Sequence, residues 1–291
     1  MTVAVLGPGA VGGALAVHLV RAGSSVVAVA RPATAAAISR HGLTLELRGS
    51  ELQARLEATV RLEEGVELLL VTVKAPALQP ALSLVAQSHK VRTVVPLLNG
   101  IEHLEILRAR FGAHVVAGSI GRFEAYRISP TRIIQTTPSP VVSLGADGEA
   151  ADILRGAGLD VRIDDERRVL WDKVVRLAPL AAATAITQRP LGELRDDPEW
   201  RATLEAAVEE ACAVAAADGA SVTPEAQWEI LDTMPASVTT SAARDAAAGR
   251  PTELDAIVGG VVRAAKGLGV QTPTLERLLD EAEDRCRPRS R

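Results

Sequence analysis

Aromatic residues are scarce in this 291-residue chain, which has three Trp, two Phe and one Tyr. Its charge is not biased towards basic residues either, because the formal net charge is −4 and the isoelectric point is near 5.8. Proteins that bind nucleic acids usually carry a basic face or stacking aromatics. The composition therefore argues against a nucleic-acid partner.

Cysteine and long apolar runs are equally sparse. The two cysteines, Cys212 and Cys286, make no disulfide framework, and no Cys or His spacing resembles a metal site. No apolar run reaches the ~18–20 residues needed to cross a bilayer. The first residues, MTVAVLG, lack the charged region of a secretory signal. We therefore expect a cytoplasmic protein with no membrane span and no metal.

The order of the sequence patterns predicts two domains. Up to residue 166, short β-branched runs alternate with helical stretches, which is typical of a parallel, doubly wound α/β sheet, with antiparallel additions near its end. Within this half, apolar and polar residues alternate along LTLELRG and LQARLEATV, as in the two strands of a β-hairpin. From residue 167 the chain is rich in Ala and Leu at helical spacing, so we expect an α/β domain over residues 1–166 and an all-α domain over residues 167–291. The basic end RCRPRSR is expected to be disordered.

A glycine-rich turn follows the first predicted strand. Gly7, Gly9 and Gly12 in VLGPGAVGG form the pattern G-x-G-x-x-G directly before a predicted helix. In this setting the glycines allow a tight turn, a close approach of the backbone to a pyrophosphate and close packing of the helix on the sheet. The N–H groups of the helix start bind the anion. We predict a Rossmann fold whose dinucleotide contacts are Gly7, Gly9, Ala10, Val11 and Gly12.

The end of the second strand indicates which dinucleotide is preferred. The strand ends VVAVARP, so Ala30 and Arg31 stand where an NAD enzyme usually has Asp or Glu for the ribose 2′-hydroxyl. An arginine here suits the 2′-phosphate of NADP. We predict NADP(H) as the cofactor. The alternative is that Arg31 is only a solvated charge at a strand end.

Two further polar residues end predicted parallel strands. Lys74 follows LLLVTV, and Asn99 follows VVPLL. Taken singly, Lys74 could be a surface charge and Asn99 part of a generic Asn-Gly turn. Together with the glycine turn and Arg31, they fall at the carboxyl ends of parallel strands, where open α/β sheets bind ligands. We interpret the set as a binding site.

One lysine interrupts an apolar segment of the second half. The segment WDKVVRLAPLAAATAI, residues 171–186, is mostly Ala, Val, Leu and Ile, and Lys173 stands near its start. Such a lysine either lays its stem on an apolar surface with the ammonium in water, or is placed to do chemistry. The residues alone leave both interpretations open.

A carboxylate falls at a predicted helix start in GRPTELD. Thr252 is a plausible N-cap, and Asp255 completes a variant capping box. Glu253 is then in the first turn, where the helix dipole favours its ionised form. A carboxylate fixed there can orient an ammonium or accept a hydrogen bond from a ribose hydroxyl. The alternative is a helix start with no further role.

Taken together, these motifs resemble the ketopantoate reductase family. The segments GPGAVGGALA, VKA, LLNGIEHLE, WDKVV…TAI…GEL and S…D…GRPTELD have the family's order and spacing over nearly the whole chain. The first and last motifs are the most specific. The resemblance implies an NADPH-dependent 2-keto acid reductase with a Rossmann domain followed by a helical domain.

The resemblance also implies roles for single residues that bind the cofactor. Arg31 matches the family's arginine for the 2′-phosphate, and Lys74 matches its cofactor-contacting lysine. Asn99 matches the asparagine that touches both the nicotinamide side and the substrate.

For catalysis, the resemblance implies that Lys173 is the catalytic lysine. Its ammonium would stabilise the charge that grows on the ketone oxygen and donate the proton. Ser241 would bind substrate, and Glu253 would position the ribose or the lysine. The alternative is an ion pair of Lys173 with Glu253 that ties the domains together without catalysis.

The positions at which the family binds its substrate differ in this chain. Four and eight residues after Lys173, where the family usually has substrate-binding asparagines, this chain has Leu177 and Ala181. A further family asparagine is replaced by Val238, and Pro179 stands at an unusual place where it should kink the helix. We expect an apolar wall at these substrate positions, which disfavours ketopantoate itself.

These observations lead to one hypothesis and one alternative. The hypothesis is an NADPH-dependent reductase of a small keto acid or other carbonyl compound, with Lys173 as general acid. The alternative is a non-catalytic NADP-binding module that senses the cofactor ratio or contacts a partner. The adjacent Gly259 and Gly260 permit close helix packing, either within a chain or in a homodimer.

Overall fold

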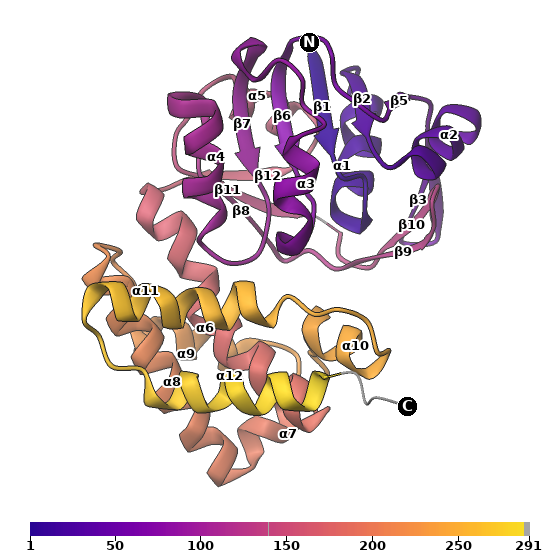
Figure 1. Ribbon diagram of the computed structural model, residues 1–291. Helices are drawn as coiled ribbons and strands as arrows, with labels where there is room; N and C mark the ends of the chain where they lie inside the picture. The colour runs from indigo at the N-terminus through magenta and orange to yellow at the C-terminus, as the bar shows by residue number, and fades with distance from the viewer. Residues whose placement is uncertain (139, 288–291) are drawn as a thin grey trace. The chain divides into compact units, whose positions relative to one another are not determined.

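The computed structural model describes residues 1–138 and 140–287. The chain divides into two compact units (Figure 1). The first contains Met1–Leu98 and His103–Val169, and the second contains Asn99–Glu102 and the chain from Leu170 onwards. Most of the basic end that we expect to be disordered, residues 288–291, lies outside the described residues.

The first unit is built on a parallel sheet with the strand order β5-β2-β1-β6-β7, in which every neighbouring pair is parallel. Its inner strands are buried on both faces, which explains their near-continuous apolar sequences. The predicted doubly wound α/β fold is confirmed. The strands are β1 (Thr2–Leu6), β2 (Ser25–Val29), β5 (Glu57–Thr59), β6 (Val66–Val71) and β7 (Val91–Pro96).

Two smaller sheets complete this unit and supply the antiparallel additions. One has the order β4-β3-β10-β9, and the other has the order β12-β11-β8. Their strands are β3 (Leu43–Leu47), β4 (Ser50–Ala54), β8 (Gly118–Gly121), β9 (Ala125–Ser129), β10 (Arg132–Gln135), β11 (Val141–Leu144) and β12 (Asp160–Ile163). The hairpin expected from LTLELRG and LQARLEATV exists as β3 and β4, but it ends at Ala54. The following β5 joins the main sheet beside β2 instead.

Helices cover the sheets of the first unit, and α1 lies between the main sheet and the β4-β3-β10-β9 sheet (Figure 1). Its buried Leu15 and Leu19 share one core with strand residues such as Val5 and Leu45. Short 3-10 turns occur at Ala75–Ala77, Ser88–Lys90 and Gly112–His114. The helices are α1 (Ala10–Arg21), α2 (Pro32–His41), α3 (Leu78–Leu82), α4 (His103–Phe111) and α5 (Glu149–Gly156).

The second unit is helical, as predicted. Its first helix, α6 (Glu166–Thr187), starts in the last residues of the first unit and continues past Pro179 without a break. Ala183, Leu194 and Leu204 form a small core against which Trp200 and Trp228 pack. The other helices are α7 (Leu191–Asp196), α8 (Pro198–Ala217), α9 (Pro224–Thr233), α10 (Ser241–Ala247), α11 (Gly260–Leu268) and α12 (Pro273–Cys286).

The helix start near Glu253 differs from the expected capping box. Helical structure begins at Leu254 and passes through a π-helical turn, Asp255–Gly259, into α11. The Asp255 carboxylate accepts a hydrogen bond from Arg263, 2.7 Å away, rather than completing a box with Thr252. The capping-box prediction was therefore wrong, because the helix begins after Thr252 and an ion pair with Arg263, eight residues further along, takes the carboxylate. π-Turns of this kind are frequent at functional sites.

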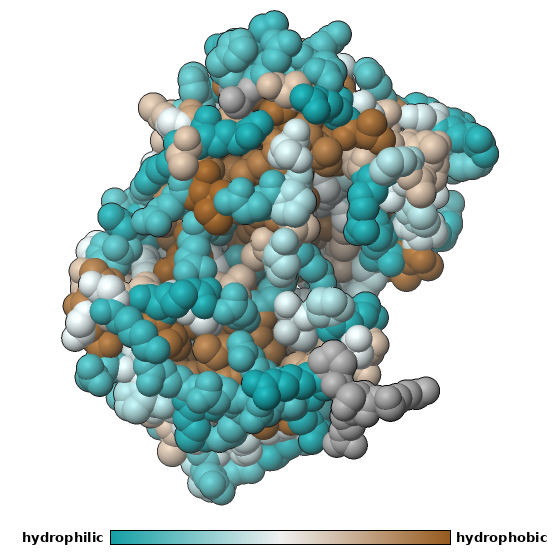
Figure 2. All heavy atoms as spheres, viewed as in Figure 1, coloured by the Kyte–Doolittle hydropathy of each residue, from teal (hydrophilic) through white to brown (hydrophobic). Residues whose placement is uncertain are grey.

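The surface seen in Figure 2 is mostly hydrophilic, with smaller hydrophobic patches scattered among the polar residues. Within residues 1–138 and 140–287, none of the helices has the length and apolar character needed to span a membrane. In the same part of the chain, no group of three or more His, Cys, Asp or Glu side chains is arranged to hold a metal ion.

Candidate active site

The residues predicted to bind the cofactor follow adjacent strands of the main sheet. Leu6 of β1 pairs with Val29 of β2 and with Val71 of β6, which in turn pairs with Pro96 of β7. The carboxyl ends of these strands therefore meet at one edge, and β1 stands where the strand order reverses. Such a reversal point is where open α/β sheets bind ligands. The residues that follow these ends are Gly7, Arg31, Lys74 and Asn99.

Two of the motif glycines are required by the local geometry, and the third leaves open space. Gly7 has φ +89°, and a Cβ there would lie 2.4 Å from Cγ1 of Val73. A Cβ on Gly12 would lie 2.2 Å from Oγ1 of Thr72, so this glycine allows α1 to pack against the β6 end. A Cβ on Gly9 would meet nothing closer than 3.9 Å, which leaves open space beside the turn. That space is what a pyrophosphate approaching the backbone requires.

The start of α1 is suited to an anion. Gly9 is the N-cap, it makes no side-chain cap, and the first turn contains no acidic residue. Ala10 and Val11 are partly exposed in this turn. The first N–H groups of a helix have no intrahelical acceptor and carry the positive end of the dipole. The residues present therefore fit a dinucleotide phosphate.

Two basic residues lie beyond the ends of β2 and β6. Arg31 is exposed and precedes α2, whose first residue is Pro32. Lys74 is also exposed, and it precedes the short turn Ala75–Ala77. The neighbour of Arg31 on the strand side is Ala30, which is buried at 7% exposure. Because an alanine has no carboxylate, this position cannot bind a ribose hydroxyl as the Asp or Glu of an NAD enzyme does.

The predicted catalytic groups form a hydrogen-bonded chain in the helical unit. Nζ of Lys173 donates to Oδ1 of Asn99 over 2.9 Å. Nδ2 of Asn99 donates to Oε2 of Glu253 over 3.5 Å. Glu253 is buried, with 8% exposure, and it immediately precedes the π-turn helix. Three residues that are far apart in the sequence are thus brought together around one ammonium.

The environment of Lys173 lowers its basicity. Burial of the ammonium lowers the pKa of Lys173 to about 8, and the positive charge of Arg176 acts in the same direction. The negative charge of Glu253 opposes both effects on this pKa. An ammonium with a pKa close to neutrality holds its proton in water but releases it readily to a strong base such as an alkoxide. The residue is therefore poised to act as an acid.

A ring of polar side chains holds Arg176 one turn away from Lys173. Nη1 of Arg176 donates to Oε1 of Gln227 over 2.7 Å and to Oδ2 of Asp172 over 3.1 Å. Nε2 of Gln227 closes the ring by donating to Oδ1 of Asp172 over 3.2 Å. Gln227 is almost fully buried on α9. Gln227 could not be found from the sequence, since no spacing connects residues on α6 and α9.

The positions expected to bind substrate differ in accessibility. Leu177 and Val238 are partly exposed, whereas Ala181 is fully buried. Ser241 is exposed and is the first residue of α10, directly after the N-cap Thr240. Of these positions, Leu177 is the one next to Arg176 on α6, and its side chain is apolar.

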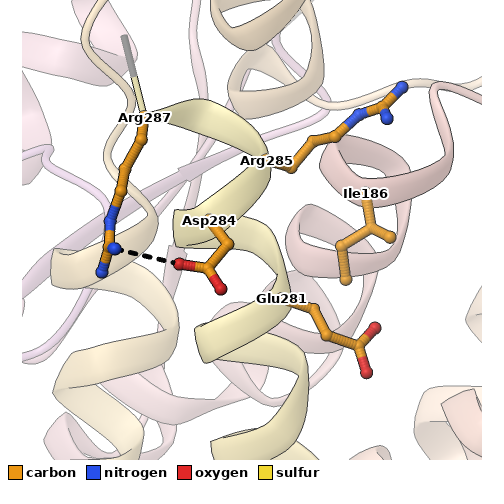
Figure 3. A pocket seen from close by; sticks show the side chains of 5 residues that line it. All are labelled: Ile186, Glu281, Asp284, Arg285 and Arg287. Atoms are coloured by element: carbon orange, nitrogen blue, oxygen red, sulfur yellow. Dashed lines mark ion pairs between the residues drawn. The ribbon is translucent and has the colours of Figure 1, made fainter. Parts of the chain in front are cut away.

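A separate hollow lies at the end of α12 (Figure 3). No residue predicted for the active site lines it, so we assign it no part in the chemistry. Its lining residues are Ile186, Glu281, Asp284, Arg285 and Arg287.

Comparison with known families gives matches over both halves of the chain. Residues 3–149 match the model of ketopantoate reductase PanE/ApbA. Residues 165–285 match the model of the C-terminal domain of the same reductase.

Single relatives match over almost their full length. An uncharacterized oxidoreductase of Bacillus subtilis, YkpB, is 27% identical over 94% of this chain and 94% of its own. The 2-dehydropantoate 2-reductase of Mycobacterium tuberculosis is 30% identical over 95% of both chains. The crystal structure of a PanE/ApbA family ketopantoate reductase from Ralstonia eutropha is 30% identical, covers 98% of both chains and superposes with a TM-score of 0.87.

Proposed function

This chain belongs to the ketopantoate reductase family, and we propose that it reduces a small carbonyl compound, a keto acid or another ketone, with NADPH as the hydride donor. The chain of hydrogen bonds from Lys173 through Asn99 to Glu253 carries the proposal. It supplies a positioned ammonium of lowered pKa, which is what carbonyl reduction needs from a protein. The alternative of a non-catalytic NADP sensor has no comparable observation in its favour.

The first unit would hold the cofactor. The N–H groups at the start of α1 would bind the pyrophosphate, and Gly9 leaves the space for it. Arg31 and Lys74 supply positive charge beyond the same sheet edge, which suits the 2′-phosphate of NADP and the cofactor phosphates. NADPH, when bound, supplies the hydride.

Lys173 would act on the ketone oxygen. As negative charge develops on that oxygen, the Lys173 ammonium stabilises it and gives up a proton. Asn99 keeps the ammonium in place by accepting one of its hydrogen bonds, and Glu253 holds the amide of Asn99 in that orientation. Ser241 would supply a hydroxyl to the substrate.

A screen tests the proposal directly. The purified chain is assayed with 2-keto acids, simple ketones and aldehydes while NADPH absorbance is followed, and with alcohols while NADP reduction is followed. Turnover of at least one carbonyl compound supports the proposal. Binding of NADPH without turnover of any compound would favour the sensor instead.

The pH dependence of reduction should report the protonation of Lys173. Because the acid must be protonated, the rate is expected to fall as the pH rises through about 8. Replacing Arg176 by methionine removes a positive charge and should move this fall to higher pH. Replacing Glu253 by glutamine removes a negative charge and should move it to lower pH. The measurement is kcat against pH for the three proteins.

Opposite shifts in these two variants are the decisive result. Arg132, whose guanidinium pairs with Glu46 and Glu51, belongs to the other unit and gives a control for the loss of an arginine charge when changed to methionine. If both site variants move the profile in the same direction, or neither moves it, Lys173 does not determine the pH limb.

Ketopantoate should be a poor substrate. Each buried polar group that loses its partner costs ~1–3 kcal/mol, and Leu177 offers no hydrogen bond to the substrate. We expect a kcat/KM for ketopantoate well below the ~10⁴ M⁻¹s⁻¹ of ordinary enzymes on their own substrates, with faster turnover of a more apolar carbonyl compound. Leu177→Asn should raise the value for ketopantoate by about tenfold, the effect of one regained hydrogen bond.

The controls for Leu177→Asn are the variant Ala181→Asn and the unmutated chain. Because Ala181 is fully buried, Ala181→Asn should lower the melting temperature without improving ketopantoate reduction. Efficient ketopantoate reduction by the unmutated chain would mean that backbone groups or waters replace the family's amides.

The proposal also includes a cytoplasmic location and a homodimer. Both cysteines are free thiols, which fits a reducing compartment. The glycine pair gives no support to the homodimer, because Gly259 and Gly260 face side chains of their own chain, Arg263 and Glu102. Light scattering after size-exclusion chromatography measures the oligomeric state.

A further inference from the structure

Arg263 of α11 forms an ion-pair cluster with Glu102 and Asp255, here called the Arg263 cluster. Its Nε and Nη2 donate to the two carboxylate oxygens of Glu102 over 2.7 and 2.8 Å. Its Nη1 donates to Oδ1 of Asp255 over 2.7 Å, and Nη2 also reaches the Asp255 carbonyl oxygen at 3.0 Å. One guanidinium thus binds the Glu102 carboxylate in a bidentate contact and makes three further bonds to Asp255, the third being Nη2 to Oδ2 at 3.5 Å.

The cluster joins the two segments that carry the partners of Lys173. Glu102 stands three residues after Asn99, in the loop Asn99–Glu102. Asp255 stands two residues after Glu253, in the π-turn. The contact of Asn99 with Glu253 is itself long, at 3.5 Å, whereas the side-chain bonds of Arg263 to Glu102 and to Oδ1 of Asp255 are 2.7–2.8 Å long.

Glycines make room for this arrangement. Gly100 has φ +88°, and a Cβ there would lie 2.4 Å from the carbonyl oxygen of Ala256. A Cβ on Gly259 would lie 2.8 Å from Oδ1 of Asp255 and 2.9 Å from Nη1 of Arg263. A larger residue at Gly100 would push the loop away from the π-turn, and a larger residue at Gly259 would displace the paired side chains of Asp255 and Arg263. Gly100 therefore allows the two segments to approach, and Gly259 leaves room for the ion pair.

We propose that Arg263 is a positioning residue that fixes Asn99 and Glu253 around the Lys173 ammonium. The inference rests on the proposed reductase function of this site. The three side chains of the cluster are all substantially exposed, so their pairing contributes little to overall stability. The pairing instead keeps Asn99 and Glu253 in position, and small misplacements of catalytic groups reduce rates far more than they reduce stability.

The test replaces Arg263 by methionine, which keeps the aliphatic stem and removes every donor. We expect kcat to fall by about tenfold, within the range that misplacement produces. The pKa of Lys173 should fall as well, because Glu253 is no longer held where its charge raises it. Arg263→Lys, which keeps the charge, and Glu102→Gln, which weakens one pair, should give smaller changes in the same directions.

The pKa of Lys173 is measured by NMR of isotopically labelled lysine side chains in the protein without substrate. This readout separates the two proposals, because it remains informative even if the substrate screen finds no turnover. Arg132→Met is the matched control, since Arg132 pairs with Glu46 and Glu51 at a similar exposure of 41%. A loss of melting temperature in Arg263→Met with an unchanged kcat and an unchanged Lys173 pKa would overturn the inference.

Discussion

Replacing Lys173 by alanine is expected to lower turnover by ~10²–10⁴-fold, the usual contribution of a general acid. The reason is that the alkoxide formed by hydride transfer loses both its stabilising charge and its proton donor. The affinity for NADPH should change little, since the predicted phosphate contacts lie in the first unit. Single-turnover rates and a titration with NADPH measure the two quantities separately.

Two further variants make this result interpretable. Lys173→Met keeps the apolar stem of the side chain, so it separates lost chemistry from lost packing. Lys266→Ala removes an exposed lysine of the same unit, which pairs with Glu276 at 3.6 Å, and should leave turnover unchanged. If Lys173→Ala weakens folding but each folded molecule keeps normal turnover, the lysine has a structural role and the catalytic assignment fails.

Replacing Arg31 by alanine is expected to abolish most of the preference for NADPH over NADH. A charge-assisted contact with the 2′-phosphate is worth ~1.5–3 kcal/mol, which corresponds to a factor of about 10–150 in Kd. The affinity for NADH should stay nearly the same, because NADH has no 2′-phosphate. Calorimetric titration with NADPH, NADH and 2′,5′-ADP measures the effect, and the last ligand isolates the phosphate from the nicotinamide.

The control for Arg31 is Arg40, an exposed arginine in the last turn of α2, the helix that Arg31 precedes. Arg40→Ala removes the same charge from the opposite end of this helix, so it measures the general electrostatic attraction. Equal affinities of the unmutated chain for NADPH and NADH would contradict the assignment of Arg31 whatever the variants do.

Local patterns were sufficient to predict most of the fold. Buried parallel strands have near-continuous apolar sequences, and the glycine spacing is informative here because it stands between the first strand and a helix. The exception, β5, follows the hairpin so closely in sequence that alternation alone assigned it to the wrong partner. The segment could pair within the hairpin sheet or with β2 of the main sheet, and no pattern within the segment indicates which of the two it joins.

The hydrogen-bonded set of Lys173, Asn99 and Glu253 was predictable only through the family resemblance, because its members are distant in sequence. Asn99 and Lys173 are 74 residues apart, and Asn99 and Glu253 are 154 apart. The Arg263 cluster was missed altogether, since Glu102 and Arg263 are separated by 161 residues. One signal was present: Asp255, Gly259 and Arg263 recur every four residues, the spacing of one helix face with a small residue between two opposite charges.

The loop that carries Asn99 also bears on the chemical ageing of the protein. An asparagine followed by glycine is prone to lose its amide when the glycine nitrogen attacks the side-chain carbonyl and forms a cyclic imide. Here the Asn99 amide is held at both ends by Lys173 and Glu253, and Gly100 lies against the carbonyl of Ala256. Ring closure requires the release of these contacts, so the folded site protects its own asparagine. Once the amide is lost, a carboxylate faces Glu253 where an N–H donor stood, and the damage occurs at the residue that bonds the proposed proton donor, Lys173.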